Sequence, residues 1–209
     1  MSPILRQIDA ANGVSLLSLL LGLLAAAFAV EGRFNAAALC LMYAGQADFF
    51  DGYVARRTKR TKLSAAAGGQ IDSLVDVCSF GFAPAIVAYC FGLRDVPSII
   101  LIFAYVSVNV LRLAYFNAQG MSTEGSTQYF TGLPVTYAAL VVPLVIACRQ
   151  ILPDDAVAMM LRVALAVLAI AMSSGFKVPK PKGVFYVIFP AGALAITAVY
   201  ARAMLAGVH

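Results

Sequence analysis

Charged residues are scarce in this chain. Only 12% of its 209 residues are charged and 62% are hydrophobic, whereas a soluble domain carries about a quarter charged residues. The shortage excludes a soluble globular domain and predicts an integral membrane protein. No polar stretch is long enough to build a second core, so we expect residues 1–209 to form one domain.

Histidine is nearly absent, and no pair of cysteines has the spacing of metal ligands. The single histidine, His209, is the last residue, which leaves no histidine for a site inside the protein. The cysteines lie scattered in apolar runs without the spacing of metal ligands, and we interpret them as small buried apolar residues. They are Cys40, Cys78, Cys90 and Cys148.

The net charge of +5 comes without a nucleic-acid-binding motif. The cations gather beside apolar spans, at 56–62 and 177–182, which is typical of loops that remain on the cytoplasmic side of a membrane. We therefore expect no nucleic-acid partner. The charge pattern predicts a cytoplasmic N-terminus and an outer C-terminus.

The apolar runs predict an all-α fold, a polytopic membrane helix bundle of six to eight transmembrane helices, of which we count seven. Residues 2–11 are predicted to form a short interfacial helix. Pro84 is expected to kink the third span, and the polar loop 117–132 is either a lid or a plain connector. The spans are a run ending at Val30, then about 34–56, 68–92, 97–116, 133–151, 156–173 and 183–205.

Four aspartates stand between positions 48 and 76, on two predicted helices. Asp48, Asp51, Gly52 and Ala55 follow one helical stripe, at i, i+3, i+4 and i+7. On the next helix, the spacing of four residues places Gly68, Asp72 and Asp76 on a second stripe. If the stripes face each other, the four carboxylates gather in one cluster.

Such a cluster needs compensating cations. An ionised aspartate at bilayer depth costs about 2.5–3.5 kcal/mol, so four would cost on the order of 10 kcal/mol. Carboxylate oxygens suit Mg²⁺ or Mn²⁺, and two such ions would neutralise the four charges. The cluster therefore predicts a site for two divalent metal ions. Structural ion pairs with the 56–62 cations are the alternative.

The pattern D-x-x-D-G-x-x-A-R followed by G-x-x-x-D-x-x-x-D resembles the signature of the CDP-alcohol phosphotransferases. The resemblance implies that the hydroxyl of an alcohol attacks the β-phosphorus of a CDP-linked lipid and that CMP leaves. It also implies a homodimer in the cytoplasmic membrane, with the active site facing the cytoplasm. The matching residues are Asp48, Asp51, Gly52, Ala55, Arg56, Gly68, Asp72 and Asp76.

The resemblance also implies roles for these residues. Asp48, Asp51, Asp72 and Asp76 would bind the metals, and Asp76 would be the catalytic base. Without histidine, cysteine or lysine on either stripe, the base is a carboxylate on chemical grounds too. The expected contacts to the CDP-lipid are Asn12, Ser15, Asp48, Gly52, Ala55, Arg56 and Gly68. Which of Thr58, Thr61, Lys62 or Ser64 touches the nucleotide stays open.

Three further stretches, 72–84, 112–117 and 130–134, resemble bacterial and archaeal phosphatidylserine synthases. The resemblance implies CDP-diacylglycerol and L-serine as substrates. Arg112 supplies one guanidinium for one carboxylate, which fits serine better than a phosphorylated alcohol. Ser79, Asn109 and Asn117 are candidates for the amino group or hydroxyl of the acceptor.

Alternatives remain at this level. Within the family, the acceptor could be another alcohol, such as glycerol phosphate or inositol phosphate. In a different class of function, an intramembrane carboxylate ring could serve a divalent-cation transporter. Arg112 could instead be a cation that only sets topology. Small residues of the last span, Gly192, Ala193 and Ala195, are compatible with helix packing in a dimer, and Arg162 has no evident role.

Overall fold

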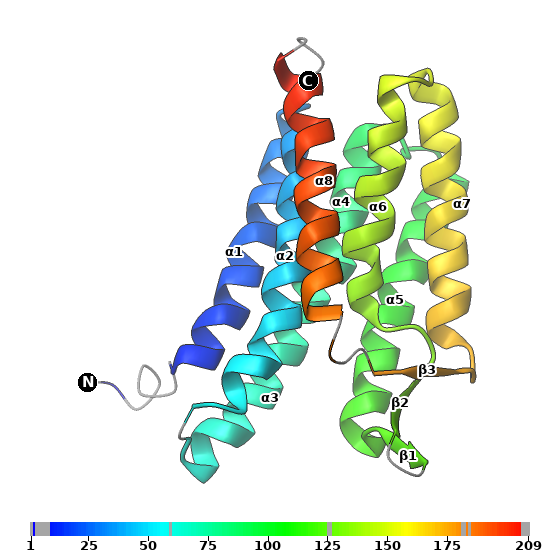
Figure 1. Ribbon diagram of the computed structural model, residues 1–209. Helices are drawn as coiled ribbons and strands as arrows, with labels where there is room; N and C mark the ends of the chain where they lie inside the picture. Colours follow the sequence, from blue (N-terminus) through cyan, green and yellow to red (C-terminus); the bar gives the residue numbers. More distant parts are fainter. Residues whose placement is uncertain are drawn as a thin grey trace.

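In the computed structural model, helices lie roughly side by side in one bundle (Figure 1). The structure describes residues 2, 9–58, 60–124, 127–180, 183 and 185–205. Within these residues each of the seven predicted spans corresponds to one helical rod, so the predicted all-α bundle is confirmed. Most of the predicted interfacial helix at 2–11 lies outside the described residues.

Five rods are single helices and two are composite. The single helices are α1 (Ala10–Val30), α2 (Phe34–Ala55), α5 (Val96–Gln119), α7 (Asp154–Ser173) and α8 (Phe185–Leu205). The third rod consists of α3 (Lys62–Asp76), the π-helical segment η2 (Val77–Phe82) and α4 (Ala83–Phe91). The fifth consists of the 3-10 segment η3 (Val135–Tyr137), α6 (Ala138–Ala147) and the 3-10 segment η4 (Cys148–Gln150).

Length and apolar composition make the chain a membrane protein. Four helical segments of the described chain are long and apolar enough to cross a membrane: Ala10–Val30, Leu63–Phe91, Val96–Gln119 and Asp154–Ser173. Large apolar side chains on these helices point outward, for example Leu23, Phe103 and Ile170, each at least 65% exposed. Such surfaces match the hydrocarbon of a bilayer, because soluble proteins rarely expose wide apolar patches.

The kink expected at Pro84 stays a prediction, and the third rod has a π-helical segment, η2, just before this proline. Pro84 has no N–H and cannot donate to the carbonyl of Phe80 four residues earlier. The buried hydroxyl of Tyr105 on α5 donates to that carbonyl instead. The π-helical segment begins directly after Asp76, and the hydrogen bond from Tyr105 links this segment to α5.

A small sheet lies at one end of the bundle, below α7 and beside the lower end of α5 (Figure 1). Strands β1 (Ser122–Glu124), β2 (Thr127–Thr131) and β3 (Lys177–Pro179) pair antiparallel in the order β1-β2-β3. The predicted polar loop 117–132 contains regular structure: α5 continues to Gln119, and the strands β1 and β2 follow. Its partner strand comes from a remote loop, which local sequence patterns do not reveal.

Small residues allow close helix contacts next to the site. A Cβ at Gly22 of α1 would lie 2.9 Å from the Cα of Ser79 in η2. At Gly45 of α2 it would lie 2.7 Å from the Cβ of Ala139 in α6. The first approach brings α1 against η2, and the second brings α2 against α6 one turn before Asp48.

Arg162, unexplained by the sequence, joins α7 to the start of α5. Its Nη2 donates to Asp95 Oδ1 at 2.7 Å, and its Nε donates to Ser98 Oγ at 2.8 Å. Hydrogen bonds from Ser98 and from Arg162 lower the pKa of Asp95 to about 2. Because Asp95 is also the N-cap of α5, this cluster is structural.

The turn at Gly132 yields a test of the fold. Gly132 has a φ of +71°, and a Cβ there would lie 2.5 Å from the carbonyl oxygen of Met172. Gly132→Ala should therefore destabilise the protein by about 3 kcal/mol, combining backbone strain and steric overlap. Gly32→Ala is the matched control, because φ is +75° and nothing lies within 4 Å. It should cost only about 1 kcal/mol. Thermal unfolding in detergent measures both, and equal losses would contradict the steric argument.

Candidate functional site

The two aspartate stripes meet where α2 faces α3. One carboxylate oxygen from each of Asp48, Asp72 and Asp76 lies within 4.8 Å of the other two. Asp51 stands beside them and accepts a hydrogen bond at 2.9 Å from Ser15 Oγ on α1. All four aspartates line one cavity of about 280 Å³.

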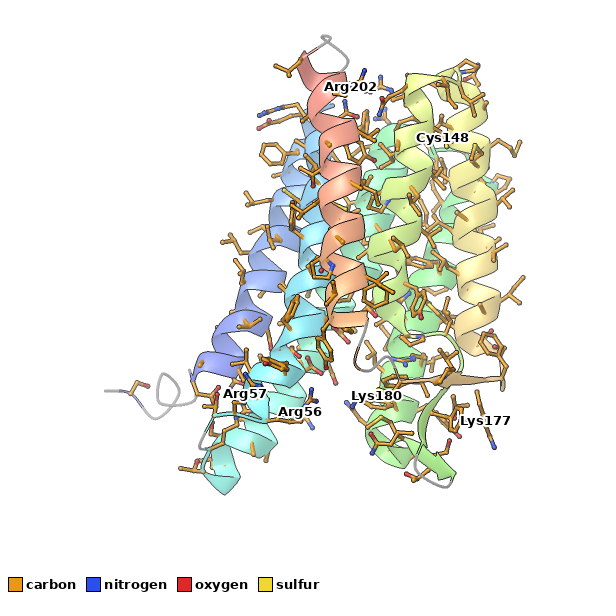
Figure 2. All side chains as sticks on the ribbon, in the orientation of Figure 1. Arg56, Arg57, Cys148, Lys177, Lys180 and Arg202 are labelled. Atoms are coloured by element: carbon orange, nitrogen blue, oxygen red, sulfur yellow. The ribbon has the colours of Figure 1, made fainter. Side chains whose placement is uncertain are left out.

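The cavity is built from distant parts of the chain. Its floor is the carboxylate cluster of α2 and α3, and Arg112 of α5 lies on its wall. The sheet contributes Phe130, the segment after β3 contributes Lys180, and α8 contributes Tyr186. Figure 2 shows Arg56 and Lys180 at the same end of the bundle. The arrangement can hold a ligand that carries several negative charges.

The donor set fits a divalent metal ion. Asp76 is only 7% exposed, and its Oδ1 has no hydrogen-bond partner among the described residues. Carboxylates this close repel one another strongly unless protons or cations intervene. Oxygen ligands in this arrangement suit Mg²⁺ or Mn²⁺. The cluster is therefore a candidate metal centre.

Two residues of the signature line the cavity: Gly52 in α2, and Arg56, which is the C-cap of α2. At Gly52 a Cβ would meet only Arg56 Nη1, at 3.7 Å, so the glycine leaves free space on the cavity side. Arg56 is exposed, and its Nη2 donates to the hydroxyl of Tyr186 at 3.0 Å. Arg56 thus faces the cavity mouth and contacts α8.

Other expected nucleotide contacts lie behind the carboxylates, against α1. Asn12 and Gly68 are buried, and both lie against the side chain of Arg60. Ser15 reaches the cluster through Asp51. Ala55 is half-buried on α2. The structure therefore brings Asn12 and Gly68 together, but neither residue lines the cavity that contains the aspartates.

Of the expected acceptor residues, only Arg112 lines the cavity. Ser79 is fully buried and donates to the carbonyl of Ser18, at 3.2 Å. Asn109 is fully buried and donates to the carbonyl of Tyr105, at 3.0 Å. Asn117 is exposed and donates to Ser73 Oγ, at 2.9 Å. None of these three residues is part of the cavity wall, and their role in acceptor binding stays a prediction.

The surroundings of Arg112 suit the binding of an anionic group. The residue is 8% exposed, and its guanidinium lies 5.4 Å and 5.7 Å from the ring centres of Phe116 and Phe130. Its Nε and Nη2 have no hydrogen-bond partner among the described residues. These two nitrogens share one edge of the guanidinium, the edge that binds a carboxylate with two parallel hydrogen bonds.

Several cavity residues were missed at the level of sequence. Lys180 appeared only as a topology-setting cation, and Tyr186 carried no signal. Phe130 belongs to the stretch 130–134, which resembles phosphatidylserine synthases but does not indicate a role for this side chain. The sheet brings Phe130 and Lys180 to the cavity, and no local pattern predicts that pairing.

A second, apolar cavity of about 320 Å³ adjoins the first, between α2, α6 and α8. Asp48, Phe49 and Tyr137 belong to the walls of both cavities. Gly192 and Ala193 of α8 line the apolar one. These small residues therefore border a cavity within one chain.

Fold and site together define a class: a polytopic helical membrane protein with a carboxylate cluster near one end of its bundle. A family model described as CDP-alcohol phosphatidyltransferase matches residues 9–205. The chain therefore belongs to the CDP-alcohol phosphatidyltransferase family, as its motif predicted.

Similar proteins with curated names include two CDP-diacylglycerol–serine O-phosphatidyltransferases and an archaetidylserine synthase. The Saccharomyces cerevisiae transferase is 37% identical over 109 residues, which are 49% of this chain and 38% of the relative. The Methanothermobacter thermautotrophicus synthase is 34% identical over 138 residues, which are 62% of this chain and 54% of the relative. The Bacillus subtilis transferase is 32% identical over 123 residues, which are 57% of this chain and 64% of the relative. The chain thus spans about half the length of the curated relatives it matches.

Removing one carboxylate should weaken metal binding. Asp76→Asn keeps the shape of the side chain but removes a charge and a metal-ligating oxygen, so the dissociation constant for Mn²⁺ should rise at least about tenfold. Mn²⁺ titration followed by electron paramagnetic resonance measures this value. The control is Asp155→Asn, which removes a carboxylate from the exposed first turn of α7. An unchanged affinity in Asp76→Asn would exclude this residue as a metal ligand.

Proposed function

We propose that this chain transfers a phosphatidyl group from CDP-diacylglycerol to the hydroxyl of L-serine, giving phosphatidylserine and CMP. The observation that carries the proposal is the placement of four carboxylates and Arg112 around one cavity. The names of the relatives support it, because they specify CDP-diacylglycerol and serine. Family membership supports the reaction class.

In this proposal Asp48, Asp51, Asp72 and Asp76 hold two divalent metal ions, Mg²⁺ or Mn²⁺. When bound, the metals supply positive charge that offsets the diphosphate and the leaving group. The protein's own part is to hold the four carboxylates at one point between α2 and α3. Gly52 keeps the adjacent wall free of side chain, and Arg56 offers further hydrogen-bond donors to the diphosphate.

Asp76 is the proposed general base. It is the most deeply buried of the four aspartates, and its Oδ1 lacks a partner among the described residues. The serine hydroxyl gives its proton to Asp76 as its oxygen bonds to the β-phosphorus. The bond between that phosphorus and the bridging oxygen breaks, and CMP leaves with the electron pair.

Arg112 is the proposed acceptor-binding residue. Its Nε and Nη2 would donate to the two oxygens of the serine carboxylate, and Phe116 and Phe130 confine the guanidinium. The number of cations does not distinguish serine from a phosphorylated alcohol as the acceptor, because Arg56 and Lys180 line the cavity together with Arg112. These two cations favour a second candidate, transfer to glycerol phosphate or inositol phosphate.

The lipid and the membrane fit the same arrangement. The adjoining apolar cavity would take part of the hydrocarbon of CDP-diacylglycerol. The cations labelled at the site end of the bundle, Arg56, Arg57, Lys177 and Lys180, support a cytoplasmic orientation in the cell membrane (Figure 2). A site near one end, rather than at the midplane, favours an enzyme over a transporter. A homodimer remains part of the proposal on family resemblance.

The proposed reaction is tested with purified protein, CDP-diacylglycerol, Mn²⁺ and a panel of alcohols. We expect CMP release that requires both serine and the metal. Release with glycerol phosphate or inositol phosphate, and not with serine, would identify the second candidate. Mn²⁺ flux into proteoliposomes without any CMP would identify a transporter and reject the enzyme.

Arg112→Lys tests the acceptor site. Lysine keeps the charge but loses the two-pronged edge, so the KM for serine should rise more than about tenfold while the KM for CDP-diacylglycerol stays within about twofold. Steady-state CMP release measures both. Arg94→Lys is the control, because Arg94 is an exposed arginine whose hydrogen bonds go to backbone carbonyls of Tyr89 and Cys90. An unchanged KM for serine in Arg112→Lys would remove Arg112 from the site.

A further inference from the structure

Arg60 belongs to no part of the signature, yet it forms a dense set of contacts beside the site. It stands in the connection between α2 and α3, and its side chain is only 15% exposed. Its Nε donates to Asp9 Oδ2 at 2.7 Å. Its Nη2 donates to Asn12 Oδ1 and to the carbonyl of Ser64. One guanidinium thus joins the start of α1 to the start of α3.

Asp9 is the other half of this cluster. Its carboxylate also accepts from the backbone N–H of Asn12 at 2.9 Å and from Ser64 Oγ at 2.6 Å. Burial raises the pKa of Asp9, but the hydrogen bonds from Asn12, Ser64 and Arg60 outweigh that effect and hold the pKa below its usual value. Asp9 is therefore a charged partner for Arg60 at neutral pH.

The guanidinium of Arg60 lies directly against Gly68. A Cβ at position 68 would collide with Arg60 Nη2, and it would lie 2.8 Å from Asn12 Oδ1. The free protein therefore already uses the space that the missing side chain leaves. At Gly52, by contrast, the space faces the cavity and is open.

The cluster continues into the carboxylate site along one face of α1. Asn12 and Ser15 are three residues apart and share that face. Asn12 meets Arg60, and Ser15 donates to Asp51. The Arg60 cluster is thus adjacent to the carboxylates on the α1 side, away from Arg112.

We propose that Arg60, held by Asp9, is a positioning residue for the CDP moiety, and that position 68 must be glycine in this chain because Arg60 lies across it. Arg60 fixes Asn12 and the start of α3, and Asn12 and Gly68 are two of the contacts to the CDP moiety that the family signature predicts. The inference rests on the proposed function for the identity of the nucleotide. It assigns this end of the site to donor binding and leaves acceptor binding to Arg112.

Kinetics of Arg60→Gln and Arg60→Lys test the role. Arg60→Gln should raise the KM for CDP-diacylglycerol at least about tenfold, with the KM for serine within about twofold. Arg60→Lys should recover part of the loss, since the charge on Asp9 is again paired. The control is Arg57→Gln, because Arg57 is an exposed arginine of the same connection that stacks on Tyr53 at 4.0 Å. It should match the wild type. An equal rise in both KM values, or a fall in kcat alone, would overturn the proposal.

A double-mutant cycle isolates the link to Gly68. Gly68→Ala should raise the KM for CDP-diacylglycerol at least about tenfold in the wild type, but less than about threefold in Arg60→Ala, where the methyl group has room. Equal effects in both backgrounds would show that the glycine serves the ligand directly, and would overturn the proposal. Thermal unfolding of each variant separates these effects from loss of the fold.

Binding of CMP in the presence of Mn²⁺, measured by calorimetry on the same variants, separates this inference from the proposed function. If the wild type binds CMP but transfers nothing to any alcohol, the reaction is rejected and the Arg60 comparison still stands. We expect Arg60→Gln to weaken CMP binding at least about tenfold and Arg57→Gln to leave it unchanged. Equal binding by Arg60→Gln and the wild type would overturn the role of Arg60.

Discussion

Mutual repulsion among buried carboxylates is the constraint on which this structure depends. Three aspartate side chains bring oxygens within 4.8 Å of one another in a bundle whose outer surface is hydrocarbon. Without compensation, that arrangement costs more than the net stability of a typical domain. The cluster is therefore stable only with protons or cations at this point, and the cavity wall already carries the cations Arg56, Arg112 and Lys180. Close packing at Gly22 and Gly45 holds the surrounding helices in place.

The carboxylate cluster could be predicted from sequence because its information is local. Spacings of three and four residues place side chains on one helix face whatever the rest of the chain does. The surroundings of Ser79 could not be predicted in the same way. Ser79 is three residues after Asp76 and would share its face in a regular α-helix, but η2 starts between them and widens the turn. The rotation sends Ser79 toward α1, where it bonds the carbonyl of Ser18.

The seven helical rods followed from the apolar runs, whereas the cavity wall did not. Phe130 and Lys180 reach the site only because β2 pairs with β3, two strands from remote loops. Strand pairing over such a separation leaves no periodic trace in either segment. The same holds for Arg162, whose partners Asp95 and Ser98 belong to another helix. Features that depend on tertiary contacts thus required the structure.

The proposed roles of Arg60 and Arg112 would place donor binding and acceptor binding at different ends of one site. In-line transfer at phosphorus requires the entering and leaving oxygens to stand on opposite sides. Arg60 lies at α1 and the start of α3, whereas Arg112 projects from α5, and α1 and α5 lie on either side of α2 (Figure 1). In the proposed reaction, the nucleotide would therefore leave on the α1 side and the alcohol would enter on the α5 side. Asp9 already pairs with Arg60, so Arg112 would be the arginine that binds the carboxylate of the acceptor.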